Sequence, residues 1–94
     1  MGIDFLDIAF EIEKLFGVRI TPADLVESPE WDHERKDCTA GALHRVICRK
    51  CEAAGLSVPR SSWNRMRIAL MRAIAVGADE IKEEAWLIRD LDMG

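Results

Sequence analysis

The hydrophobic and polar positions of this chain recur mainly with the period of α-helices. From Ile3 to Phe16 the apolar residues fall on one side of a helix and acidic residues stack on another, which predicts an amphipathic helix. Its apolar stripe consists of Phe5, Ile8, Ala9, Ile12, Leu15 and Phe16. Gly17 is suited to end this helix, and Thr21 and Pro22 are suited to cap and begin a short helical turn through Glu27.

Two further long helices are predicted in the second half of the chain. Thr39 can cap a helix that begins at Ala40 and is ended by Gly55. The apolar stripe of that helix is Leu43, Val46, Ile47 and Ala54. Ser62 can cap the other helix, which covers residues 63–77. Its residues at core spacing are Trp63, Met66, Leu70, Ala73 and Ile74.

The remaining segments are predicted to connect these helices. Residues 28–38 mix proline, charge and a tryptophan without a clear period, which indicates a loop that Trp31 attaches to the core. A short turn is expected from Asp79 to Glu84, and an apolar patch follows at Ala85 to Ile88. Because strand-like alternation is sustained nowhere, we predict an all-α fold, a bundle of three to four helices.

Length and composition suit one folded domain over residues 1–94. Apolar residues are 49% and charged residues 32% of the chain, which is a globular balance. No run approaches the roughly 20 apolar residues of a membrane span. Since Met1 leads into Asp4 and Asp7 rather than into a basic and apolar leader, we expect a cytoplasmic protein.

Charge is strongly segregated along the chain, although the net charge is only −4. Residues 1–34 carry nine acids and two bases, residues 35–72 carry nine bases and two acids, and residues 73–94 carry six acids and two bases. Such blocks can pair within the fold or steer a charged partner. Nucleic acid is disfavoured as that partner, because the basic block has one aromatic residue and is flanked by acidic ones.

Cysteine and histidine supply the candidate metal and catalytic chemistry. His44, Cys48 and Cys51 are spaced to lie on one side of the second long helix. Cys38 or His33 could complete a zinc site. A C-x2-C pair inside a helix lacks the turn that lets two thiolates face one ion, so buried or half-exposed cysteines are the favoured interpretation. Cys48 and His44 could also form a nucleophile pair, but no orienting third group is apparent, so we do not predict an enzyme.

Three stretches of the chain resemble acyl carrier proteins, the carriers that bind phosphopantetheine. "GIDFLDIAFEIEKLFGVRIT" is similar to that family's second helix, which starts at an Asp-Ser-Leu sequence and ends at Glu-x-x-Phe-Gly. "CTAGALHRVI" resembles the family's last helix. "WNRMRIALMRAIAVGADEIKEEAWLIRDLDMG" is similar to the first helix and its following loop, which ends in Leu-Ile-x-Asp-Leu-Gly.

These stretches stand in an altered order, so the resemblance implies a circularly permuted acyl carrier protein with its helices in the order second, third, first. Residues 51–62 are long enough to link the old ends. Residues 28–38 and 55–61 have no clear counterpart in the family. Because Met1 and Gly94 are then expected to lie close together, exchange of the first-helix segment between two chains is a route to a homodimer.

The resemblance also implies that the attachment point of the cofactor is missing. Gly2 stands where the family's phosphopantetheine serine belongs, and glycine has no hydroxyl group, so we assign no cofactor. What remains is an acidic recognition surface of Asp4, Asp7 and Glu11, which the family would direct at basic patches of partner enzymes. These acids can equally serve only to solvate the helix and to complement its dipole.

The expected function is therefore that of an atypical carrier-like protein of fatty-acid, polyketide or lipid synthesis, acting through protein contacts. One alternative is a true carrier that is modified elsewhere, at Ser61, Ser62 or a thiol. The other is a small zinc-binding domain that uses cysteine and histidine ligands.

Overall fold

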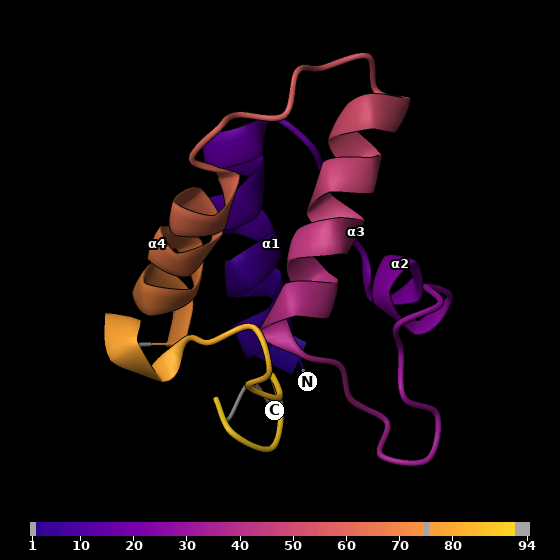
Figure 1. The fold of residues 1–94 in the computed structure, drawn as a ribbon, viewed down its shortest axis with the longest axis vertical. Helices are drawn as coiled ribbons and strands as arrows, with labels where there is room; N and C mark the ends of the chain where they lie inside the picture. The colour runs from indigo at the N-terminus through magenta and orange to yellow at the C-terminus, as the bar shows by residue number, and fades with distance from the viewer. Residues whose placement is uncertain (1, 75, 92–94) are drawn as a thin grey trace.

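The fold is all-α over the residues that the computed structural model describes, which are 2–74 and 76–91, without the side chains of residues 2–4. Four α-helices and one 3-10 turn follow one another along the chain (Figure 1). They are α1 (Gly2–Phe16), α2 (Pro22–Val26), α3 (Ala40–Ala53), α4 (Ser62–Ile74) and η1 (Ala78–Glu80). Within these described ranges the only β-type pairings are two isolated bridges, so the predicted helical class is confirmed.

Helix α1 makes its most extensive helix contact with α4, although the two lie far apart in sequence (Figure 1). Ile8 and Ile12 of α1 are buried in the same core as Met66 and Leu70 of α4. Burial of one such side chain contributes about 1.5–3 kcal/mol, so these residues account for much of the stability of the pair. The predicted apolar stripe of the first helix is confirmed, with Ala9 and Leu15 partly buried at its margins.

The residues predicted to cap α1, α2 and α3 are confirmed by their contacts. Gly17 has a left-handed φ of 78° and its N–H donates to the carbonyl of Glu13 at 2.9 Å, as a helix-ending glycine does. Thr21 caps α2 in a reciprocal pair with Asp24. The Thr39 hydroxyl accepts a hydrogen bond from the N–H of Ala42 at 3.1 Å and so caps α3.

Three details of the predicted helices are wrong. Ala54 is exposed rather than part of the apolar stripe, because α3 ends at Ala53 and Gly55 turns the chain away with a φ of 75°. Ser62 is the first residue of α4 rather than its cap, since the carbonyl of Ser61 accepts the N–H of Arg65. The fourth helix also ends at Ile74, short of the predicted residue 77.

The segment after α4 returns to the beginning of α3 and pairs with it. Ala40 donates to the carbonyl of Ala85 at 2.8 Å, and Leu87 donates to the carbonyl of Cys38 at 2.9 Å. Ala85 and Leu87 are buried, and Ile88 is partly buried, so the predicted apolar patch joins the core. Within the turn region expected at residues 79–84, η1 covers residues 78–80, and a further turn is closed by the N–H of Ala85, which donates to the carbonyl of Lys82 at 3.0 Å. Trp31 packs partly buried against the core, as predicted for the loop before α3.

The start of α1 and the end of the described chain lie at the same end of the molecule (Figure 1). The predicted proximity of Met1 and Gly94 themselves lies outside the described residues. None of the helices in the described part of the chain combines the length and the apolar character needed to cross a membrane.

Candidate functional site

The outward face of α1 carries two large apolar side chains. Leu6 is 66% exposed and Phe10 is 59% exposed, and no other large hydrophobic residue in the described part of the chain exceeds either value. They are four residues apart and therefore neighbours on the helix surface. The ammonium group of Lys14, one turn further on, lies 4.6 Å from the centre of the Phe10 ring. Single exposed apolar residues are common, but an adjacent pair on one helix is a candidate contact surface.

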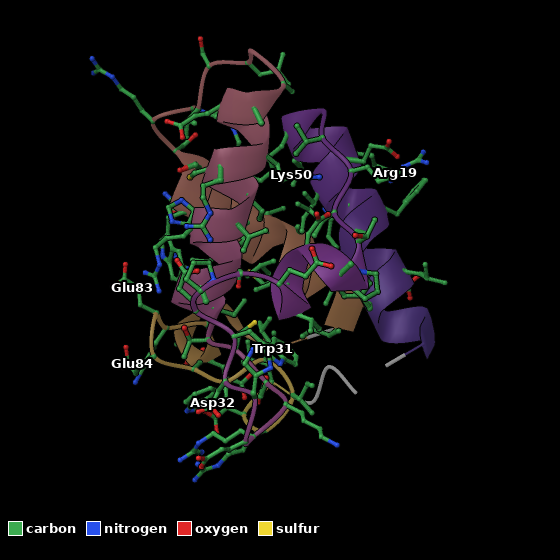
Figure 2. All side chains as sticks on the ribbon, turned by 90° about the vertical axis from the view of Figure 1, so that its right-hand side faces the viewer. Arg19, Trp31, Asp32, Lys50, Glu83 and Glu84 are labelled. Atoms are coloured by element: carbon green, nitrogen blue, oxygen red, sulfur yellow. The ribbon has the colours of Figure 1, made fainter. Side chains whose placement is uncertain are left out.

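A groove of about 320 Å³ lies beside this pair, between α1 and the extended segment that follows it. Its lining includes Phe5, Leu6, Ala9, Phe10, Ile20 and Pro22. The lining also includes a charged pair, since Arg19 Nη2 lies 3.3 Å from Glu13 Oε2. Arg19 points away from the body of the molecule (Figure 2). The groove thus combines an apolar lining with one exposed ion pair.

The three acids predicted to face a partner differ in how far the structure shows them to be exposed. Asp7 is exposed beside Leu6 on α1. Glu11 is only 16% exposed, because its carboxylate lies 3.5 Å from Lys14 Nζ and 3.6 Å from Arg72 Nη1 of α4. The side chain of Asp4 lies outside the described part of the structure, and Gly2 begins α1. Asp7 is therefore the best-defined acidic group of this surface. We call Leu6, Asp7 and Phe10 the α1 surface.

The acidic and basic blocks of the sequence meet within the fold around α3. Glu30 binds two arginines of that helix, Arg45 at 3.2 Å and Arg49 at 2.8 Å. The hydrogen bond from Arg49 is the main reason why the pKa of Glu30 falls to about 2. Lys50, labelled in Figure 2, lies 3.3 Å from Asp24 of α2. Several residues of the basic block therefore form ion pairs with the first acidic block at the surface of the fold.

The cysteines and histidines do not assemble as the four-ligand zinc site requires. Cys38 and Cys51 are each 1% exposed and belong to the apolar core, which raises the pKa of both thiols. In the described ranges, no three side chains of His, Cys, Asp or Glu gather around one point. Only Cys48 lies near His44, with its sulfur 3.6 Å from Nε2.

His44 also reaches across to α4, where Ser62 Oγ lies 2.7 Å from Nε2. A catalytic relay uses one ring nitrogen for the nucleophile and the other for the orienting group. Here both contacts involve the same nitrogen, so Ser62 does not orient His44 toward Cys48 in that manner. Burial lowers the pKa of His44, although the carboxylate of Glu83 offsets part of this effect.

Comparisons with protein-family models, curated proteins and solved structures found no match for this chain. The relationship to acyl carrier proteins therefore remains a prediction from the sequence.

Some residues of the sites were not apparent in the sequence. Leu6 and Phe10 fall beside the predicted apolar stripe of α1, and this offset is the one sequence signal that they face outward. The contact between His44 and Ser62 joins residues 18 positions apart on different helices, so no local pattern could have indicated it.

Proposed function

We propose that this protein is an atypical acyl-carrier-like protein of fatty-acid, polyketide or lipid synthesis that binds partner enzymes through its α1 surface. The observation that carries this proposal is the exposed pair Leu6 and Phe10 beside the exposed Asp7. A basic patch with an apolar centre on a partner would complement this surface. The acidic group would speed and select the encounter, and the apolar pair would supply most of the affinity.

The packing of the helices supports a permuted carrier arrangement. In such an arrangement the helix that comes last in sequence packs against the first, and α4 makes that contact with α1. The segment that ends in "WLIRDL" pairs with the loop before α3, at the same end of the molecule as the start of α1 (Figure 1). We assign α1, α3 and α4 to the second, last and first helices of the carrier family.

The protein acts, in this proposal, without bearing the thioester. Gly2 stands at the family's serine position and offers no oxygen for a phosphate ester. Two other serines could accept the phosphopantetheine in its place. Ser62 is 7% exposed and its hydroxyl is hydrogen-bonded to His44, which leaves it poorly accessible. Ser61 is exposed but its hydroxyl accepts a hydrogen bond from Arg65 Nε at 3.3 Å.

Incubation with a phosphopantetheinyl transferase and coenzyme A tests the absence of the arm. Intact mass spectrometry should show no added phosphopantetheine under conditions that fully modify a standard carrier. A stoichiometric adduct would overturn this part of the proposal. Peptide mapping to Ser61 or Ser62 would instead support a carrier that is modified at an unusual site.

Capture of partner enzymes from the source organism tests the docking surface. The wild-type protein should retain identified synthases of acyl chains, whereas Asp7→Lys should reduce their retention about tenfold, and the Leu6→Ser/Phe10→Ser double variant should abolish it. Glu84→Lys and Ile68→Ser are matched controls, since both residues are exposed away from the α1 surface. Equal retention by all variants, or capture of unrelated proteins only, would contradict the proposal.

A further inference from the structure

Most of the exposed large hydrophobic side chains lie on two helices that pack side by side. In the described part of the chain there are six such residues, and four of them belong to α1 and α4. Leu6 and Phe10 face outward from α1. Ile68 and Met71 of α4 are 40% and 37% exposed, and their spacing makes them neighbours on the helix surface. Each of the two helices thus presents an apolar pair to solvent.

Two contacts show that the outer sides of α1 and α4 adjoin. Arg72 Nη1 lies 3.6 Å from Glu11 Oε1, and Arg65 Nη1 donates to the carbonyl of Leu15 at 3.3 Å. Both arginines are within four positions of Ile68, so the three side chains share one side of α4. The outer side of α1 therefore continues, across these two arginines, into the exposed side of α4. We call this continuous surface the α1/α4 face; its residues are Leu6, Asp7, Phe10, Arg65, Ile68, Met71 and Arg72.

The two halves of the α1/α4 face carry opposite charge. Helix α1 contains four acids and one lysine, a net charge of −3, whereas α4 contains three arginines and no acid, a net charge of +3. Asp7 is exposed on the α1 half. The side chain of Arg72 is still 58% exposed although it pairs with Glu11. A surface with one acidic and one basic half is complementary to a second copy of itself in which the halves are exchanged.

A two-fold axis parallel to the helices produces this exchange. It places α1 of one copy over α4 of the other, and it keeps every residue at its own height along the helices. Because Leu15 meets Arg65 and Glu11 meets Arg72, the two helices run antiparallel. The part of α1 before Glu11 therefore lies level with the later part of α4, and the two-fold axis brings those parts of the two copies together.

We propose that two copies of this chain associate through the α1/α4 face as a reversible homodimer. Asp7 of one copy then faces Arg72 of the other, and Phe10 of one copy packs against Ile68 and Met71 of the other. Each contact occurs twice, as two-fold symmetry requires. All helices stay within their own chain, in contrast to an exchange of segments.

The size of the face predicts weak association. Helices of 15 and 13 residues are about 20 Å long, and packed helices lie about 10 Å apart, so the face measures about 20 by 20 Å. This area of about 400 Å² per copy is below the roughly 800 Å² that each partner buries in a standard interface. We therefore expect a dissociation constant of about 10–100 µM. If the proposed function holds, on which this one consequence rests, the dimer covers the α1 surface and excludes partner enzymes from it.

Sedimentation velocity of the purified protein tests the dimer. From about 1 to 500 µM the wild type should shift from monomer to dimer. Phe10→Ser and Ile68→Ser should each weaken association at least tenfold. Val26→Ser and Leu56→Ser are matched controls, because these exposed hydrophobic residues lie outside the α1/α4 face, and both should associate like the wild type. A monomer at every concentration, or a dimer that all four variants retain, would overturn the proposal.

Charge reversal tests the pairing of the two halves. Asp7→Arg and Arg72→Glu should each be monomeric alone, because like charges then face each other at both contacts. An equimolar mixture of the two variants should form a heterodimer, since the introduced arginine faces the introduced glutamate. No association in the mixture would refute this arrangement of the copies. Circular dichroism establishes that each variant folds, and the serine variants decide if Arg72→Glu does not.

The same variants separate this proposal from the proposed function. Capture of enzymes at concentrations well below the dissociation constant uses the monomer, so Ile68→Ser should lose the dimer and still retain partner enzymes. A wild type that dimerises but captures no synthase would refute the proposed function and leave the dimer standing. Capture by a wild type that stays monomeric would refute the dimer alone.

Discussion

The carboxylate of Asp37 accepts a hydrogen bond from the backbone N–H of Ile88 at 3.0 Å, across 51 positions of sequence. The N–H groups of Cys38 and Arg89 donate to the same side chain at 2.7 Å and 3.1 Å. Asp37 is only 3% exposed. This buried acid therefore fastens the end of the described chain to the loop before α3, and its charge is balanced by three backbone dipoles.

Removal of this carboxylate should be strongly destabilising. Asp37→Ala leaves three N–H groups without their acceptor, so the free energy of unfolding should fall by about 3 kcal/mol. Asp37→Asn retains one carbonyl oxygen and should cost about half as much. Urea denaturation followed by circular dichroism measures both. A loss below about 0.5 kcal/mol for Asp37→Ala would show that the segment is held by its apolar contacts alone.

Replacement by alanine should destabilise the protein at two glycines, for a different reason at each. At Gly41 a Cβ atom would meet the carbonyl oxygen of Glu83 at 3.1 Å, whereas at Gly55 no atom lies within 4 Å but φ is 75°. Gly41→Ala should therefore cost about 1–3 kcal/mol by displacing the paired segment, and Gly55→Ala about 1 kcal/mol by backbone strain.

Hydrogen exchange separates these two causes. In Gly41→Ala the amide of Ala40, which donates to the carbonyl of Ala85, should exchange faster than the global stability loss explains. In Gly55→Ala the exchange rate of the Ala40 amide should rise only as far as the loss of global stability explains. If the Ala40 amide were affected equally in both variants, the contact assigned between a Cβ at Gly41 and the carbonyl oxygen of Glu83 would be contradicted.

Replacement of large side chains of α1 by alanine should distinguish its buried residues from its exposed ones. Ile12→Ala should lower the free energy of unfolding by about 2–5 kcal/mol, because Ile12 is fully buried. Leu6→Ala on the same helix should change it by less than about 0.5 kcal/mol, because Leu6 is 66% exposed. Thermal and urea denaturation measure both. A large loss at Leu6 would assign it a packing role and weaken its assignment to a docking surface.

The sequence could predict those parts of the fold that depend on local chemistry. The periodic stripe of α1 and the capping residues Gly17, Thr21 and Thr39 all act within a few positions, and all were placed correctly. The start of α4 was misplaced by one residue, because both Ser61 and Ser62 are suitable caps. The backbone hydrogen bond from the N–H of Arg65 to the carbonyl of Ser61 distinguishes them, together with the contact of Ser62 with His44, which is not local.

The long-range polar contacts could not be predicted. Asp37 lies between Lys36 and Cys38 in a charged loop, where the composition indicates exposure, yet the backbone of residues 88 and 89 buries it. Glu11 looked like an outward acid of a recognition helix, but Arg72 of α4 draws its carboxylate inward. In both cases the partner belongs to a distant segment of the chain, and the spacing of residues within one segment carries no information about it.

The ion pairs of Glu30 should make stability depend on pH in acid. Because its folded-state pKa is lowered from 4.5 to about 2, its contribution is fully present above about pH 4.5 and is lost as pH falls toward 2. Glu30→Gln should therefore be less stable than the wild type at pH 6, by about 1 kcal/mol or less for a pair near the surface. The difference should shrink as pH falls and vanish only below about pH 2. Glu84→Gln, at an exposed acid in the segment after η1, serves as the control, and its stability should stay parallel to that of the wild type. If the Glu30→Gln curve were also parallel from pH 2 to 6, the contacts with Arg45 and Arg49 would contribute nothing to folding in solution.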